Sequence, residues 1–202
     1  SADYASTVRA SVYDSCDNVV PVVGLERMVD PFGPTGGKLV RASECAEANK
    51  VAFIHCACSR DRNYRKHCSR ICCMASLKQS TYVSEQFGDD AEVSIYYIDI
   101  RAIDRFDDFY QRVQDDKNVT FIKSKVANIV ENKANGNPTL HGVDTEGYNR
   151  YANEHDLVVL AVGMEPSVDK DTFPIEIKVN DEGFIEHDEA NGGVFAAGCS
   201  SD

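Results

Sequence analysis

The sequence lacks any apolar run approaching the roughly 20 residues that a membrane-spanning helix requires. Basic residues are also scarce: 21 Lys and Arg stand against 33 Asp and Glu, which gives a net charge of -12. This balance argues against a nucleic-acid surface, where a basic field would be expected. No secretory signal peptide is visible, and the chain begins with Ser rather than Met. We therefore expect a piece of a larger, cytoplasmic protein that neither spans a membrane nor binds nucleic acid.

A glycine-rich nucleotide turn is missing as well. In a dinucleotide-binding βαβ unit, glycines after the first strand let the backbone approach the pyrophosphate at the helix N-terminus. Here the apolar run 51–54 is typical of a buried parallel strand, but the residues that follow it are His55-Cys56-Ala57-Cys58-Ser59-Arg60. Thiols stand where glycines would be, so the pattern predicts a Rossmann-like corner without its nucleotide cradle.

The eight cysteines are too few and too clustered for a secreted disulfide framework, in which a short chain spreads its cysteines. Five of them lie between Cys56 and Cys73, on either side of a basic loop. This clustering indicates metal, cluster or redox chemistry inside the cell. The isolated Cys16 and Cys45 are expected to be packing residues.

Four of the clustered cysteines, Cys56, Cys68, Cys72 and Cys73, have the spacing C-x11-C-x3-C-C. Four thiolates can hold a cubane iron–sulfur cluster, and a helix N-terminus with a basic loop favours thiolates and an anionic cluster. Tetrahedral zinc competes, although its ligands are usually separated by two or more residues. A dithiol, a disulfide, or buried cysteines without a ligand would also fit the pattern. We expect Cys58 to be a bystander.

The periodicity of the remaining chain predicts an α/β fold with a Rossmann-like parallel sheet and a small antiparallel β-meander. Helices are expected over 24–30, from 72 to a C-cap near Gly88, and over 104–116 with Asp104 as the N-cap. Strands are expected over 19–23, 51–55, 92–100, 119–123, 126–131, 139–144, 157–162 and 194–197.

Several motifs together carry a family resemblance, which covers the chain from about residue 18 to residue 202. The sequence resembles the A-subunit family of heterodisulfide reductase, which includes the related flavoprotein subunits of the quinone-interacting membrane-bound oxidoreductase. The matching motifs are Gly33-Pro34-Thr35-Gly36-Gly37, Val51-Ala52-Phe53-Ile54-x-Cys56, Ser59-Arg60-Asp61, Cys68-Ser69-Arg70-x-Cys72-Cys73, Ile98-Asp99-Ile100-Arg101, Val162-Gly163-Met164 and Val194-Phe195-Ala196-Ala197-Gly198-Cys199, where x is a residue outside the match.

The resemblance implies an electron-transferring flavoprotein subunit with FAD and a [4Fe–4S] cluster, similar in fold to the pyridine-nucleotide domain of thioredoxin-reductase-like flavoproteins. In that family the four cysteines matching Cys56, Cys68, Cys72 and Cys73 ligate the cluster. A glutamate and a lysine matching Glu26 and Lys78 lie near the flavin ring, where a cation could stabilise a reduced flavin anion. Ordinary exposed helix residues are the alternative for both. Cofactor contacts are further implied for Gly163, Gly198 and Cys199.

The resemblance also implies a domain plan. Residues 1–50 would be a partial segment of the flavin-binding domain and a connector, 51–165 a Rossmann-like domain with the cysteines, and 166–202 a truncated return into the flavin-binding domain. We therefore expect a central fragment, inactive alone and without bound FAD. Its partners would be further subunits of a redox complex, through which it could associate with a membrane-bound complex. A zinc-stabilised interaction module and an NAD(P)H-dependent disulfide reductase domain are the competing hypotheses.

Overall fold

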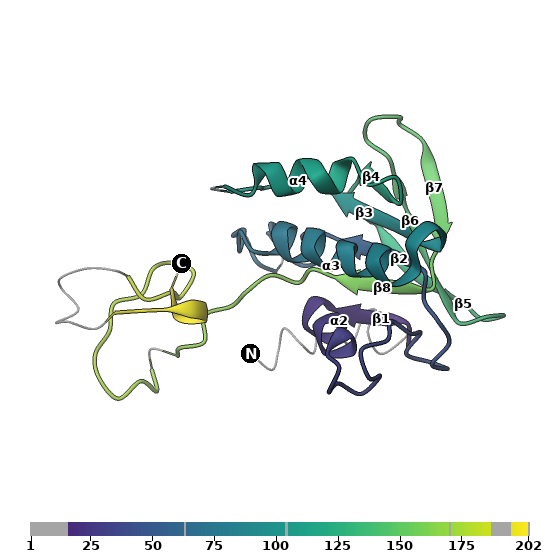
Figure 1. The fold of residues 1–202 in the computed structure, drawn as a ribbon. Coiled ribbons are helices and arrows are strands. Elements are labelled where there is room, and N and C mark those ends of the chain that lie inside the picture. The colour runs from purple at the N-terminus through teal and green to yellow at the C-terminus, as the bar shows by residue number, and fades with distance from the viewer. Residues whose placement is uncertain (1–15, 63, 104, 170, 187–194, 202) are drawn as a thin grey trace.

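A five-stranded parallel sheet forms the centre of the molecule. The computed structural model describes residues 16–62, 64–103, 105–169, 171–186 and 195–201. Its strands are arranged in the order β1-β8-β2-β3-β4, and every neighbouring pair is parallel (Figure 1). The strands are β1 Val19–Pro21, β8 Leu157–Leu160, β2 Lys50–Ile54, β3 Glu92–Tyr97 and β4 Val119–Lys123.

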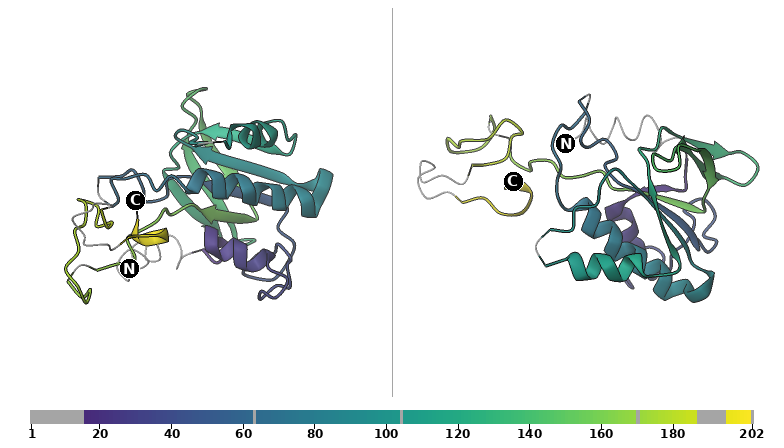
Figure 2. Two further views of the ribbon diagram at one scale, coloured as in Figure 1. Left: turned by 60° about the vertical axis from the view of Figure 1, so that its left-hand side comes forward. Right: turned by 90° about the horizontal axis from the view of Figure 1, so that it is seen from above.

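Three α-helices lie together on one side of this sheet, as the views from the front and from above show (Figures 1 and 2). They are α2 Val22–Val29, α3 Cys72–Phe87 and α4 Asp107–Gln114. Two 3-10 turns, η2 Gly88–Asp90 and η4 Gly198–Ser200, complete the helical elements of the described residues. The opposite face carries a three-stranded antiparallel meander of β5 Asn128–Asn132, β6 Asn137–Val143 and β7 Arg150–Glu154.

The sequence of β2 shows why both faces are covered. Successive side chains of a strand point to opposite faces of the sheet. Val51 and Phe53 accordingly pack in the core on the helical side. Ala52 and Ile54 pack with Leu140 of the meander. Because both faces are buried, the strand is a continuous apolar run rather than an alternating one.

The predicted fold class is confirmed, and most predicted elements are present, with shifted ends. The C-cap prediction is correct, because α3 ends at Phe87 and Gly88 has a φ of 57°. The strand predicted over 19–23 is shorter, since α2 begins directly after Pro21. The helix predicted over 104–116 spans only Asp107–Gln114, and its predicted N-cap, Asp104, lies outside the described residues.

The C-terminal prediction needs a correction. The described part of the strand expected over 194–197, residues 195–197, is not in a strand, and Val194 is not described.

The residues before 50 contribute to the same sheet as the cysteine-bearing unit, because β1 pairs with β8. Among the helices that the structure describes, none is both long enough and apolar enough to cross a bilayer.

Candidate iron–sulfur site

The loop of residues 55–71 connects the end of β2 to the start of α3 and carries the cysteines. Cys56, Cys58 and Arg60 all have positive φ values, between 55° and 58°, so the left-handed conformation recurs at every second residue. Such alternation directs successive backbone N–H groups to one side and creates concavities that bind anions, including iron–sulfur clusters. Hydrogen bonds within the loop, from Asp61 N to Arg65 O (2.7 Å) and from Arg60 N to His67 O (3.3 Å), hold this unusual backbone.

The four predicted ligand cysteines come together at this corner. Every one of the six pairs among Cys56, Cys68, Cys72 and Cys73 interacts closely enough for one thiol to affect the ionisation of the other. Cys73 is buried and the other three are partly buried. Cys72 and Cys73 are the first two residues of α3, and Cys56 follows the end of β2. The structure therefore gathers in space the set that the spacing and the resemblance suggest.

Burial dominates the ionisation of three of these thiols, Cys56, Cys72 and Cys73. It raises the pKa of Cys72 to about 11, and it also raises the pKa of Cys56 and of Cys73. The negative charges of the neighbouring thiolates act in the same direction. At neutral pH Cys56, Cys72 and Cys73 are therefore thiols, and ionising them together requires a cationic centre among them.

A nitrogen donor lies beside each of the four sulfur atoms, and Cys73 Sγ in addition donates to Asp99 O at 3.9 Å. One donor is the guanidinium of an arginine, and the other three are backbone N–H groups. The pairs are Arg60 with Cys56, Arg70 with Cys68 (3.4 Å), Gly163 with Cys72 and Arg101 with Cys73. Hydrogen bonds of this kind stabilise thiolates and set the reduction potential of iron–sulfur centres.

A small charged network supports the donor to Cys56. Arg60 Nη1 lies 2.7 Å from Asp99 Oδ1, and Arg101 Nε lies 3.5 Å from the same oxygen. The hydrogen bond to Asp99 is the main cause of the raised pKa of Arg60, so this guanidinium stays charged beside the sulfur. Sequence reasoning assigned no role to Asp99 and Arg101. The sequence predicted a strand through residue 100; because β3 ends at Tyr97, both residues lie in the chain that follows it, at the edge where the carboxyl ends of parallel strands meet.

Gly163 fits its place only as a glycine. Its φ is +80°, and a Cβ atom there would lie 2.4 Å from Ser59 Oγ and 2.8 Å from Ser69 Oγ. Ser69 Oγ in turn accepts a hydrogen bond from Met164 N at 2.7 Å. The chain after β8 is therefore pressed against the cysteine loop, which brings the Gly163 backbone to Cys72. The resemblance implied a cofactor contact for Gly163, and the structure places this residue beside a candidate cluster ligand.

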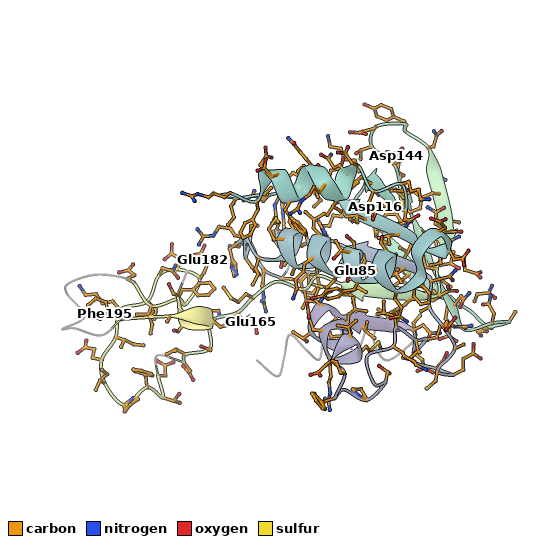
Figure 3. All side chains as sticks on the ribbon, in the orientation of Figure 1. Glu85, Asp116, Asp144, Glu165, Glu182 and Phe195 are labelled. Atoms are coloured by element: carbon orange, nitrogen blue, oxygen red, sulfur yellow. The ribbon has the colours of Figure 1, made fainter. Side chains whose placement is uncertain are left out.

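The segment that follows Met164 contacts the cysteine loop through an ion pair and a contact between two rings. Arg65, which is only 7% exposed, forms an ion pair with Glu165. His67 packs edge-on against Phe184 with ring centroids 5.5 Å apart, and its Nε2 lies 3.2 Å from Met164 O. Glu165 appears in Figure 3 at the junction between the sheet and the C-terminal segment. Two parts of the chain that are distant in sequence thus fix the shape of the corner.

Within the described part of the chain, no group of three or more His, Cys, Asp or Glu side chains is arranged to hold one metal ion. Four thiols are the ligand set of a cubane cluster and of tetrahedral zinc alike. His55, next to Cys56, is 5% exposed, and burial lowers the pKa of its ring to about 4, so it adds no positive charge.

Glu26 and Lys78 are brought together by the packing of α2 against α3. Lys78 Nζ lies 3.3 Å from Glu26 Oε1. Lys78 also lines a cavity of about 590 Å³ between α3 and the segment that carries α4, to which Ile71, directly before α3, contributes as well. The other lining residues are Met74, Ala75, Arg105, Phe106, Asp108, Phe109 and Arg112.

Gly198 and Cys199 lie elsewhere, in the C-terminal segment that extends from the sheet edge in Figure 1. Gly198 has a φ of +61°, and a Cβ atom there would meet nothing within 4 Å. Cys199 is exposed, and its carbonyl accepts a hydrogen bond from Ser167 N at 2.8 Å. The cofactor contacts expected for these two residues stay predictions.

Comparison with known proteins identifies relatives over most of the chain. No family model matches. The chain is 34% identical over 199 residues to a protein of Methanopyrus kandleri, named as an A-type iron-sulfur subunit of CoB--CoM heterodisulfide reductase, covering 93% of this chain and 30% of that protein. It is 36% identical over 196 residues to the A subunit of the ferredoxin/F(420)H(2)-dependent CoB-CoM heterodisulfide reductase of Methanosarcina acetivorans, covering 91% of this chain and 24% of that protein.

The fold has a solved counterpart as well. Thioredoxin reductase of T. acidophilum matches with a TM-score of 0.54 and 16% identity, over 92% of this chain and 50% of that one. This likeness supports the predicted thioredoxin-reductase-like fold. The chain spans less than a third of the length of the curated relatives it matches. By its sequence similarity to them, the chain belongs to the A-subunit family of heterodisulfide reductase.

Proposed function

We propose that this chain holds a [4Fe–4S] cluster through Cys56, Cys68, Cys72 and Cys73 and takes part in electron transfer within a heterodisulfide-reductase-like complex. The observation that carries the proposal is the convergence of four thiols, each with a nitrogen donor beside its sulfur atom. The name of the Methanopyrus relative, which calls it an iron-sulfur subunit, supports the same interpretation. The proposal places the parent protein in the cytoplasm, together with other redox subunits.

A bound cluster would supply one-electron chemistry, and the chain's own residues would set its conditions. Arg60 and the three backbone N–H groups would stabilise negative charge on sulfur and so favour the reduced state. The ion pair between Arg65 and Glu165 would keep the loop closed over the sulfur atoms. In this arrangement the protein binds, orients and tunes the electron carrier.

A flavin neighbour is the second part of the proposal. Lys78 lines a cavity between α3 and the segment that carries α4, and its Nζ pairs with Glu26 on α2. A flavin ring of the complete protein facing this wall would meet a cation that stabilises its reduced anion. Under the proposed domain plan of 1–50, 51–165 and 166–202, the flavin-binding domain would supply the remaining FAD contacts, with Gly198 and Cys199 among them.

The first experiment measures iron, acid-labile sulfide and zinc per chain after anaerobic purification and reconstitution. We expect about four irons and four sulfides per chain for a cubane cluster. The Cys72→Ser variant should lose them, because one of four thiolate ligands is gone. The matched control is Cys45→Ser, since Cys45 is an exposed cysteine outside the loop.

Different results would favour the competing hypotheses. One zinc per chain without sulfide would favour the zinc-stabilised interaction module. Iron incorporation that survives in Cys72→Ser would show that Cys58 or another group serves as a ligand. Tight binding of NADH or NADPH would favour the nicotinamide-dependent disulfide reductase domain. No iron after reconstitution would refute the cluster assignment for this chain.

A further inference from the structure

Gln79 is a fully buried polar residue between α2 and α3, and it is neither a candidate cluster ligand nor a donor to one. Its side chain is 0% exposed. The amide Nε2 donates to Val22 O at 2.9 Å and to Glu26 Oε1 at 3.1 Å. Val22 and Glu26 are four residues apart on α2, so a single amide group holds two successive turns of that helix.

The orientation of this amide is determined by its neighbours. Both Val22 O and the Glu26 carboxylate are acceptors, so the NH₂ group and not the carbonyl oxygen must face them. Among the described residues, Gln79 Oε1 has no hydrogen-bond partner. Burying an amide oxygen without a partner is unfavourable, and an apolar side chain of similar size would avoid that cost. The polar identity of residue 79 is therefore best explained by the contact with Glu26.

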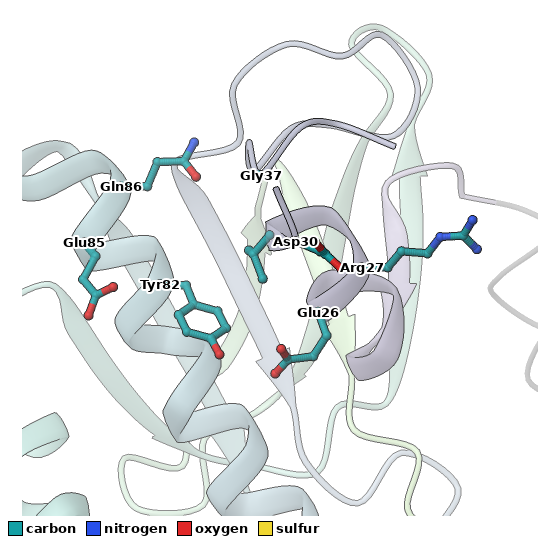
Figure 4. A pocket seen from close by; sticks show the side chains of 8 residues that line it. Glu26, Arg27, Asp30, Gly37, Tyr82, Glu85 and Gln86 are labelled. Atoms are coloured by element: carbon teal, nitrogen blue, oxygen red, sulfur yellow. The ribbon is translucent and has the colours of Figure 1, made fainter. Parts of the chain in front are cut away.

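The same carboxylate oxygen also accepts from Lys78. Glu26 Oε1 lies 3.3 Å from Lys78 Nζ and 3.1 Å from Gln79 Nε2, so both donors meet one oxygen. Lys78 also lies over the ring of Tyr82, with Nζ 5.3 Å from the centroid. In Figure 4 the carboxylate of Glu26 on α2 is directed toward Tyr82 on α3. Without the amide, an exposed Glu26–Lys78 pair would sample many rotamers.

We propose that Gln79 is a positioning residue, which holds the Glu26 carboxylate in the one orientation that fixes the Lys78 ammonium between α2 and the ring of Tyr82. The functional meaning of this arrangement rests on the proposed function, because it takes Lys78 as the residue that faces a reducible ring. Two rigid elements, α2 and α3, then present the cation. A surface lysine alone could not keep its charge at a defined distance from a neighbouring electron carrier.

The test is the titration of the Lys78 amine, followed by NMR in protein with isotope-labelled lysine. In the wild type, the hydrogen bond with Tyr82 and then the pairing with Glu26 raise the pKa of Lys78. The charged groups that face it are Glu26 and, across the cavity, Arg105, Asp108 and Arg112. Gln79→Met keeps the size of the side chain and removes the amide, so the pKa of Lys78 should fall by as much as in Glu26→Gln.

A double variant tests whether Gln79 affects Lys78 through Glu26. If Gln79 acts through Glu26, then Gln79→Met combined with Glu26→Gln should lower the pKa of Lys78 no further than either change alone. Gln79→Asn, whose amide is one methylene too short to reach Glu26, should behave like Gln79→Met and serves if the first variant fails to fold. The control is Ser80→Ala, because Ser80 is equally buried on α3 but donates to Leu77 O.

An unchanged Lys78 titration in Gln79→Met and Gln79→Asn, with a clear shift in Glu26→Gln, would overturn the positioning role. Fully additive shifts in the double variant would do the same. The titration is measured on metal-free and on iron-loaded protein. It therefore stands or falls separately from the iron and sulfide analysis, which tests the proposed function.

Discussion

At the scale of single residues, the corner depends on backbone groups as much as on the thiols. Gly163 shows this most clearly, because its backbone lies beside Cys72 while its missing Cβ makes room for two serine hydroxyls. Non-glycine residues at Cys56, Cys58 and Arg60 adopt the left-handed conformation, which normally costs about 1 kcal/mol or more per residue. Surrounding contacts must hold such residues in place, and they commonly do so at functional sites.

The first residue-scale prediction concerns Gly163→Ala. The added methyl meets both the positive φ penalty and the clash with Ser59 and Ser69, so we expect a loss of about 2–4 kcal/mol in the free energy of unfolding. Urea denaturation measures it. Gly36→Ala is the control, since its φ is +61° and a Cβ there meets nothing within 4 Å. A loss no larger than that of Gly36→Ala would show that the two serines can move aside.

At the scale of elements, side-chain networks fix how the pieces of the fold meet. The turn of the meander is an example: the side-chain nitrogens of Asn132, Asn135 and Asn137 all donate to the Glu154 carboxylate, at 2.8 to 3.0 Å. These hydrogen bonds, the one from Asn132 first, lower the pKa of Glu154. The carboxylate therefore ties the turn between β5 and β6 to β7.

A pH dependence follows from this lowered pKa. The carboxylate is favoured more in the folded than in the unfolded chain, so its stabilisation is present above the ordinary glutamate pKa. It is lost as pH falls through the lower, folded-state value. We expect Glu154→Gln to be less stable than wild type at pH 7, with the difference shrinking below about pH 4.5. Urea unfolding at several pH values measures it, with the exposed Glu85→Gln as control. A gap that stays constant with pH would contradict the network.

At the scale of the whole molecule, charge is distributed unevenly. The chain carries a net charge of -12, yet the cysteine corner gathers Arg60, Arg65, Lys66, Arg70 and Arg101. Asp99 and Glu165 pair with Arg60, Arg101 and Arg65 there, and the local positive charge would compensate the proposed anionic cluster and its thiolates. The corner also joins the sheet, the start of α3 and the C-terminal segment, so a bound cluster would link parts of the chain that are far apart in sequence.

Loading should therefore stabilise the whole fold. A group that binds only the folded chain adds its binding free energy to stability, and about 3 kcal/mol would raise Tm by roughly 6–12 °C in a protein of this size. Anaerobic calorimetry of reconstituted and metal-free protein measures the shift. The Cys72→Ser variant should show none. Equal Tm values for loaded and metal-free wild type would mean that the corner is already complete without a bound group.

Local patterns in the sequence were enough to predict the parallel sheet, the meander, the C-cap at Gly88 and the four clustered cysteines. These features depend on periodicity and on short spacings, which the chain encodes over a few residues. The ends of elements were less predictable. Strand β1 ends at Pro21, and α2 begins with the next residue. The strand expected at residues 195–197 is not formed.

Only the tertiary structure decided which distant groups meet. Three sets of contacts join separate parts of the chain. Gly163 and Arg101 lie beside cysteine sulfur atoms, and Glu165 forms an ion pair with Arg65. One oxygen of Glu26 accepts hydrogen bonds from both Lys78 and Gln79. Backbone N–H donors in particular leave no mark in the sequence, since nearly every residue has one. The residue types determined which chemistry is possible, and the packing of β3, β8, α2 and α3 determined where its charges and hydrogen bonds lie.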